Sequence, residues 1–267
     1  MLLRSITKHV RDQNWFAVAL DFVIVVAGVG FAMYGQAWLS DRQQRADMAV
    51  AEHALQADLV VNYLNAKERL AVAGCRKDAY QAIAAQLLEP GEAWTPMPRP
   101  VSDDEVFEQM LPPVLRSPSR NWGSRTWDAE LARGTFAQMV TERREWLDLI
   151  FKQARYAEEL QNGVNALEGR LKILAVTTTI SQSERRRYYE ILGELDDKSG
   201  TADLISQQII RYIEAVGIFA IPEALFVEAG GLGEFLKQSH ERGQSIYGAC
   251  YTPFEVPLLN PFIEEAK

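Results

Sequence analysis

Histidine and cysteine are scarce in this chain of 267 residues, which holds three histidines and two cysteines. None of them stands in a metal-ligand spacing such as C-x-x-C or H-E-x-x-H, so the sequence predicts no metal site. A G-x-S-x-G nucleophile elbow is absent, and Gly230-Gly231-Leu232-Gly233 lacks the G-K-[ST] ending of a phosphate loop. Adjacent acidic pairs such as Asp103-Asp104 point apart on a helix and make poor acid/base partners. The sequence therefore predicts a protein that is not an enzyme and that uses no cofactor.

Positive charge is also in deficit, because the formal net charge is −8. Nucleic-acid binding requires a basic face, so we expect no nucleic-acid partner. The densest basic run, Arg185-Arg186-Arg187 beside Tyr188-Tyr189, is interpreted as a solvated helix face, with contact to an anionic headgroup as the alternative. His53 and His240 are likewise expected on solvated helix faces.

One long apolar run stands out from this ordinary polar composition, from Trp15 to Leu39. A membrane-spanning helix needs about 20 mostly apolar residues, and backbone groups in lipid must be satisfied within the helix. The aromatic residues Trp15, Tyr34 and Trp38 match the belts that mark the two membrane interfaces. No A-x-A-like cleavage site follows the run, which argues against a signal peptide. The sequence therefore predicts a transmembrane helix over 14–39.

Basic residues set the predicted orientation of this helix. Arg4, Lys8 and Arg11 precede the span, whereas Arg42 and Arg45 follow it beside two aspartates. The positive-inside rule then places residues 1–13 in the cytoplasm as a basic amphipathic segment. Residues 40–267 are predicted to form a periplasmic domain, anchored in the inner membrane of a bacterium.

Small residues and one carboxylate share a face of the predicted span. At helical spacing, one stripe contains Ala17, Asp21, Gly28, Ala32 and Gly35. The pair Gly28-x-x-x-Ala32 allows a second helix to approach closely. Asp21 either stays hydrated near the headgroups or contacts a buried partner, because an ionised carboxylate in lipid is costly. The stripe predicts self-association or docking onto another membrane protein.

The N-terminal residues also carry a family resemblance. Gln13-Asn14-Trp15, the core Asp21-Phe22-Val23-Ile24-Val25-Val26-Ala27-Gly28-Val29 and Gln36-Ala37-Trp38 are similar to a group of uncharacterised proteobacterial single-pass membrane proteins. The match covers roughly residues 1–45, and Thr126-Trp127 with Leu131 and Gly134 is a weaker one. The usual N-W-N closing is replaced here by Ala37-Trp38-Leu39. The resemblance implies a membrane anchor with a helical outer domain, and it implies no activity.

The rest of the chain reads as helices separated by irregular segments. Apolar residues at a spacing of three to four predict helices over 41–73, 78–88, 102–110, 136–175, 181–193, 202–219 and 232–240. Prolines between 90 and 100 and near 112–118 predict irregular loops, with Trp122 and Trp127 packed onto the core. No alternating strand pattern appears. We therefore expect an all-α fold, with a helical bundle after the transmembrane helix.

Cys75 and Cys250 leave two interpretations open. They form either one disulfide, as in many exported domains, or two separate buried thiols.

The functional prediction is a membrane-anchored interaction protein, an accessory subunit of a larger inner-membrane complex, with the lipid bilayer and a membrane protein or a second copy as partners. The alternative is a ligand-binding, sensor-like periplasmic domain that relays through a partner.

Overall fold

Helices make up most of the structure, which is a computed structural model. It describes residues 15–97, 118–216 and 225–256, and side chains are described from residue 19 onward. The α-helices are α2 (Trp15–Leu70), α3 (Ala73–Leu88), α4 (Arg125–Arg133), α5 (Thr141–Arg170), α6 (Gln182–Val216) and α7 (Leu232–Tyr247). Short 3₁₀ helices are η3 (Thr135–Gln138), η4 (Lys172–Ala175) and η6 (Gly248–Cys250). The predicted all-α fold, with one long apolar N-terminal helix before a helical domain, is confirmed.

Two compact units divide the chain at Val50 and Ala51. The first unit contains the apolar part of α2, and the second contains the C-terminal part of α2 and every later element. Helix α2 runs without a break through this boundary, as the absence of glycine and proline over 41–73 predicts. The sequence predicts a break between the helices over 41–73 and 78–88, at Gly74, but the chain turns earlier, at Ala71-Val72, and Gly74 lies inside α3.

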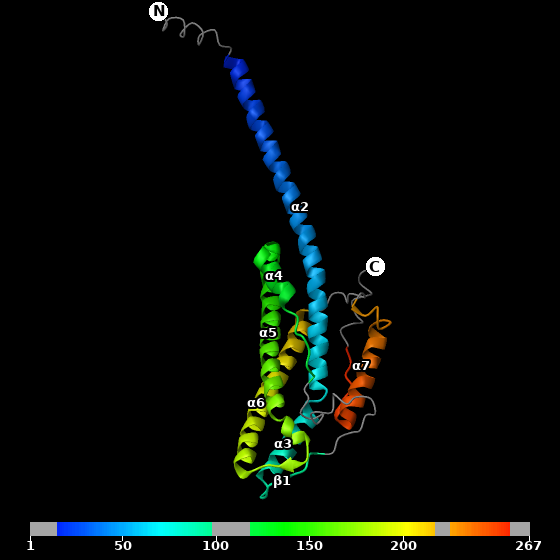
Figure 1. Cartoon of the computed structure of the whole chain (residues 1–267). Coiled ribbons are helices and arrows are strands. Elements are labelled where there is room, and N and C mark those ends of the chain that lie inside the picture. Colours follow the sequence, from blue (N-terminus) through cyan, green and yellow to red (C-terminus); the bar gives the residue numbers. More distant parts are fainter. Residues whose placement is uncertain (1–14, 98–117, 217–224, 257–267) are drawn as a thin grey trace, which may run out of the picture. The chain divides into compact units, whose positions relative to one another are not determined.

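Helices α5 and α6 run side by side in opposite directions, and α3 packs against α6 (Figure 1). The sequence predicts two helices where the structure has the single helix α6, which passes through Gly193 and Gly200. Each glycine costs a helix about 1 kcal/mol relative to alanine. Burial of Leu192, Leu195 and Ala202 on the inward face of α6 offsets that cost.

The main apolar core lies between α3, α5 and α6. Its buried members come from these three helices and from the short segments that connect them. They are Tyr80, Ile83, Leu87, Trp94, Val164, Leu167, Leu171, Leu174, Ile180, Ile191, Leu192 and Leu195. Strands β1 (Ala93–Trp94) and β2 (Thr178–Thr179) pair antiparallel and close one edge of this core. Trp94 Nε1 donates to the Leu174 carbonyl at 3.0 Å, so the buried indole N–H is satisfied.

A second aromatic core forms around Trp127, which is fully buried. Its ring stacks on Phe136 at 5.1 Å and on Phe151 at 5.5 Å between centroids. Trp122 is buried as well, so the predicted packing of both tryptophans onto the core is confirmed. Gly134 adopts φ 76° and ends α4 as a left-handed C-cap.

Helix α5 is shorter than the predicted helix over 136–175. The extended backbone of Met139 and Val140 separates η3 from α5, and η4 follows α5 after Leu171. Gly163 and Gly169 do not interrupt α5. The predicted helix over 102–110 lies outside the described residues.

Candidate interaction surfaces

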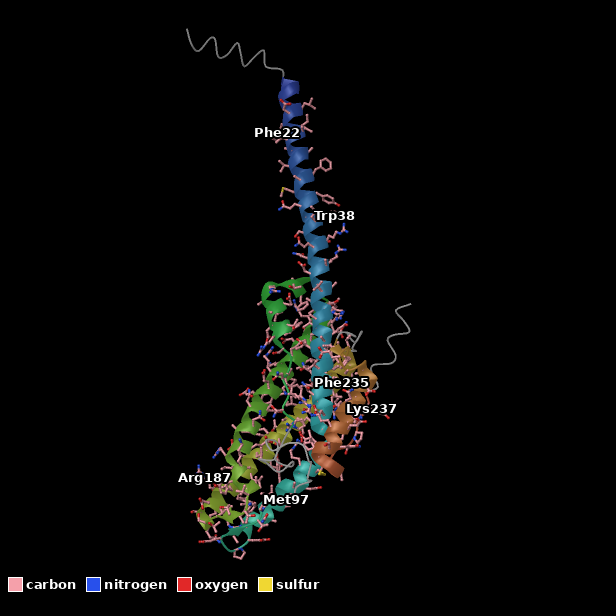
Figure 2. All side chains as sticks on the ribbon, turned by 45° about the vertical axis from the view of Figure 1, so that its right-hand side comes forward. Phe22, Trp38, Met97, Arg187, Phe235 and Lys237 are labelled. Carbon is pink, nitrogen blue, oxygen red and sulfur yellow. A yellow bond between two sulfur atoms is a disulfide. The ribbon has the colours of Figure 1, made fainter. Side chains whose placement is uncertain are left out.

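The side chains of the apolar part of α2 are exposed. This helix is long and apolar enough to cross a membrane, and none of its most apolar 18-residue window is buried inside the protein. Large side chains point outward from it, including Phe22 at 68% and Trp38 at 54% exposure (Figure 2). A bare apolar surface of this extent is costly in water and is satisfied by lipid or by another apolar helix.

The stripe residues lie on this bare helix. Asp21, Gly28, Ala32 and Gly35 all belong to α2, and a methyl group added at Gly28 or Gly35 would meet no atom within 4 Å. Trp15 and Ala17 also lie in α2, and their side chains fall outside the described set. The described stripe is therefore free of packing within its own unit.

Polar contacts begin just after the apolar part of α2. Tyr34 is 74% exposed, and the Arg42 guanidinium lies 5.8 Å from the Trp38 ring centroid. Arg45 pairs with Asp41 one turn before it.

The two cysteines are joined. Cys75 at the start of α3 forms a disulfide with Cys250 in η6, across a sequence separation of 175 and a Cα–Cα distance of 5.2 Å. The next residues add two contacts: the Thr252 N–H donates to the Ala71 carbonyl at 2.9 Å, and Tyr251 packs on Ala71 and Val72. These bonds hold the segment after η6 against the junction of α2 and α3.

A buried charge cluster, which we define as Arg69, Arg76 and Asp203, connects α2, α3 and α6. Arg69 Nε pairs with Asp203 Oδ1 at 2.9 Å, and Arg76 donates to both carboxylate oxygens at 2.5 Å. Both arginines are nearly inaccessible, at 2% and 4% exposure. Arg69 also donates to the Ser199 carbonyl at 3.0 Å. The cluster thus fixes three helices through one carboxylate.

Burial governs the electrostatics of this cluster. It lowers the pKa of Arg69, and the neighbouring charge of Arg76 acts in the same direction, whereas Asp203 opposes both. Burial also raises the pKa of Tyr80, beside Ser199, to about 12.

Arg185 departs from the expectation of a solvated basic run. It is buried, and it donates to the carbonyls of Gln86 at 2.8 Å and Ala93 at 2.6 Å, with the Trp94 ring 5.9 Å away. Arg185 therefore satisfies carbonyls at the end of α3 and in β1. Arg186 and Arg187 are exposed, as the prediction of a solvated face requires.

His240 also departs from its prediction. His53 is exposed as expected, but His240 is half-buried on α7, with ring contacts to Tyr251 at 5.9 Å and Phe254 at 5.0 Å. The helix face that carries His240 covers the segment after η6, which the local spacing of α7 could not reveal. Burial and the charge of Glu68 raise the pKa of Tyr251 to about 12.

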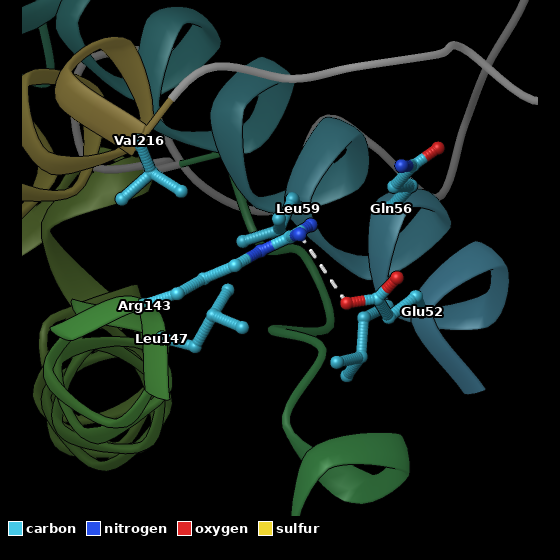
Figure 3. Close-up of a pocket in the computed structure, with 7 residues that line it drawn as sticks. Glu52, Gln56, Leu59, Arg143, Leu147 and Val216 are labelled. Atoms are coloured by element: carbon cyan, nitrogen blue, oxygen red, sulfur yellow. Dashed lines mark ion pairs between the residues drawn. The ribbon is translucent and has the colours of Figure 1, made fainter. Parts of the chain in front are cut away.

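A small pocket lies between α2 and α5 (Figure 3). Leu55, Leu59, Leu147 and Val216 supply its apolar walls, and Arg143 pairs with Glu52 across it at 3.3 Å. Its volume of about 10 Å³ leaves room for one water molecule at most. This pocket is too small for an organic ligand.

A wider groove, which we call the Lys67–Arg211 groove, has a volume of about 540 Å³. One side is formed by Lys67 and Leu70 of α2, and the other by Ile210 and Arg211 of α6. Residues Thr252–Phe254 form the end wall. The sequence gives no sign of it, because these three segments are far apart in the chain.

Among the residues whose side chains are described, no three His, Cys, Asp or Glu side chains come together to hold a metal ion. Comparison with known proteins adds no relative: no family model matches the chain, and neither the curated proteins nor the solved structures contain a match.

Proposed function

We propose that this chain is a membrane-anchored, non-enzymatic interaction protein, an accessory subunit of a larger complex in a bacterial inner membrane. The observation that carries the proposal is the exposed apolar surface of α2, which none of the described residues covers. Lipid satisfies most of such a surface, and the small residues on one stripe leave room for a partner helix. The helical domain after α2 supplies a second surface for the partner.

The disulfide supports a periplasmic location for the helical domain. Structural disulfides persist in oxidising compartments and are rare in the cytosol of most organisms. Cys75 and Cys250 lie after the span, so their bond fits an orientation with the N-terminus in the cytoplasm. The basic residues before the span favour the same orientation.

Fractionation tests the anchor. The full-length protein is expected in the membrane fraction after a high-pH carbonate wash, and in the soluble phase only after detergent is added. Protease added to intact spheroplasts should then digest the residues after α2. Recovery of the intact, unprocessed chain without detergent contradicts the anchor, and protection from the protease contradicts the orientation.

Purification in mild detergent from native membranes tests the partner. We expect at least one membrane protein to co-elute in a fixed ratio, or the chain to elute as a defined oligomer. Gly28→Leu should weaken that association, because a bulky side chain keeps a second helix away. Gly30→Leu is the matched control, since Gly30 lies on a different face and its surroundings are equally open. Equal behaviour of both variants contradicts docking through the stripe.

A second candidate function, a ligand-binding and sensor-like domain, is favoured by one observation. The volume of the Lys67–Arg211 groove is within the range of small-molecule pockets, which is roughly 300 to 1,000 Å³. Binding there and docking of the membrane helix are compatible with each other.

A further inference from the structure

The Lys67–Arg211 groove is held in shape before any ligand arrives. Its end wall begins two residues after Cys250, whose disulfide to Cys75 fixes the start of this segment. The Thr252 N–H bond to the Ala71 carbonyl then fixes the wall itself. A preformed site spends less binding free energy on ordering its own residues.

The charges around the groove are unequal. Its one acidic side chain, Glu214, already accepts a hydrogen bond from the Tyr63 hydroxyl at 2.9 Å. Lys67 lies over the Tyr63 ring at 5.2 Å, and Arg211 is exposed on α6. Neither cation forms an ion pair with another described residue. The groove therefore carries two cationic groups and one carboxylate, an excess of positive charge that favours an anion.

The uncharged lining of the groove is mostly apolar, with Gln207 and Thr252 as its two polar members. Leu70 and Ile210 face it from the two helices, and Pro253 and Phe254 close its end. Inorganic anions would leave this surface in water, whereas an apolar body would bury it at a gain of about 25 cal/mol per Å². Charge and lining together select a molecule with one anionic end and one apolar end.

We propose that the Lys67–Arg211 groove binds a small apolar monocarboxylate. The carboxylate accepts hydrogen bonds from Lys67 and from the fork of Arg211, and the apolar body lies on Leu70, Ile210 and Phe254. This inference rests on the second candidate function and is independent of whether α2 docks onto a partner. The co-elution experiment and the binding experiment can therefore fail separately.

The test uses the full chain in lipid nanodiscs, with 4-phenylbutyrate as the probe and empty nanodiscs as the blank. Equilibrium dialysis should show saturable binding above the blank. Lys67→Met and Arg211→Met should each weaken it by about tenfold, since a hydrogen bond to a charged group is worth roughly that factor. Arg187→Met is the matched control: it removes an exposed charge from the same helix away from the groove, and binding should not change.

Neutral 4-phenylbutanol separates charge recognition from partition into an apolar surface. We expect it to bind at least about tenfold more weakly than the carboxylate. Circular dichroism melts of each variant confirm that the chain is folded before binding is compared. Equal binding of the two probes, or unchanged binding in both groove variants, overturns the proposal.

Discussion

Arg76 donates to both carboxylate oxygens of Asp203 at 2.5 Å, although 127 residues separate them in the sequence. Arg69 shares the same carboxylate from a third helix. Removing one partner from a buried ion pair is strongly destabilising, because the remaining charge stays buried without compensation. Asp203 is thus the residue on which the arrangement of α2, α3 and α6 depends most directly.

Asp203→Asn should lower the free energy of unfolding by about 3–5 kcal/mol. Urea unfolding of the detergent-solubilised protein, followed by tryptophan fluorescence, measures the change. Asp196→Asn is the matched control, because Asp196 is exposed on the same helix. The two variants should differ clearly, and a loss below about 1 kcal/mol for both would show that the cluster does not hold the helices together.

Removing the disulfide should destabilise the domain. The loop-entropy estimate for a separation of 175 residues is about 5 kcal/mol, and measured effects are commonly smaller. We expect the Cys75→Ala/Cys250→Ala double variant to unfold at a lower urea concentration than the oxidised wild type. Wild-type protein treated with dithiothreitol should match the double variant. An oxidised wild type that is insensitive to the reductant would contradict the disulfide.

Gly243 provides a test of the packing between α7 and the segment after η6. A methyl group at Gly243 would lie 2.4 Å from Tyr251 Cε2, so α7 and Tyr251 cannot both keep their positions. Gly243→Ala should cost about 1–3 kcal/mol of stability. Gly233→Ala on the same helix meets no atom within 4 Å and should cost nothing, since alanine favours the helix. Hydrogen exchange of the α7 amides should distinguish the two variants.

Asp58 should make stability depend on pH. Burial raises the pKa of its carboxyl above the ordinary value of 3.8, although hydrogen bonds with Thr126 act in the opposite direction. The folded state therefore binds the Asp58 proton more tightly than the unfolded state does. This contribution is fully present below pH 3.8 and is lost as the pH rises through the higher pKa of the folded state.

Asp58→Asn carries no charge at any pH and should remove this term. The variant is expected to gain stability relative to wild type as the pH rises from about 4 to 7, because only wild type must bury a carboxylate. Urea unfolding of both proteins at several pH values measures the difference. A difference that shrinks as the pH rises would reverse the assigned direction of the pKa shift.

Helix content could be predicted from the sequence because local apolar spacing determines it. The periodicity of Leu55, Leu59 and Tyr63 predicts the C-terminal part of α2, and each of these side chains is buried. The separate helices predicted over 181–193 and 202–219 are one helix in the structure, because tertiary burial outweighs the low helix propensity of Gly193 and Gly200. The start of α6 carried a signal that could have been used: Ser181 and Glu184 form a capping box, in which the Glu184 N–H donates to Ser181 Oγ at 3.3 Å.

Some of the candidate functional surfaces could be predicted from local sequence, and others could not. The apolar run and its stripe are contiguous in sequence, so they could be recognised without a structure. Arg69 and Asp203 are ordinary charged residues on separate helices, and nothing local indicates that they meet. The groove likewise depends on the approach of Lys67, Arg211 and Thr252, which come from three distant segments. Contacts of this kind follow from the packing of the helices, which local patterns do not encode.

The link between Cys75 and Cys250 also constrains the order of events during biogenesis. Its second thiol, Cys250, is synthesised only after the residues of α3 to α7, so oxidation must come late. Among these 267 residues, neither cysteine has a second possible partner. Correct pairing therefore needs no reshuffling by an isomerase, and non-covalent contacts of the earlier helices bring the second sulfur to the first.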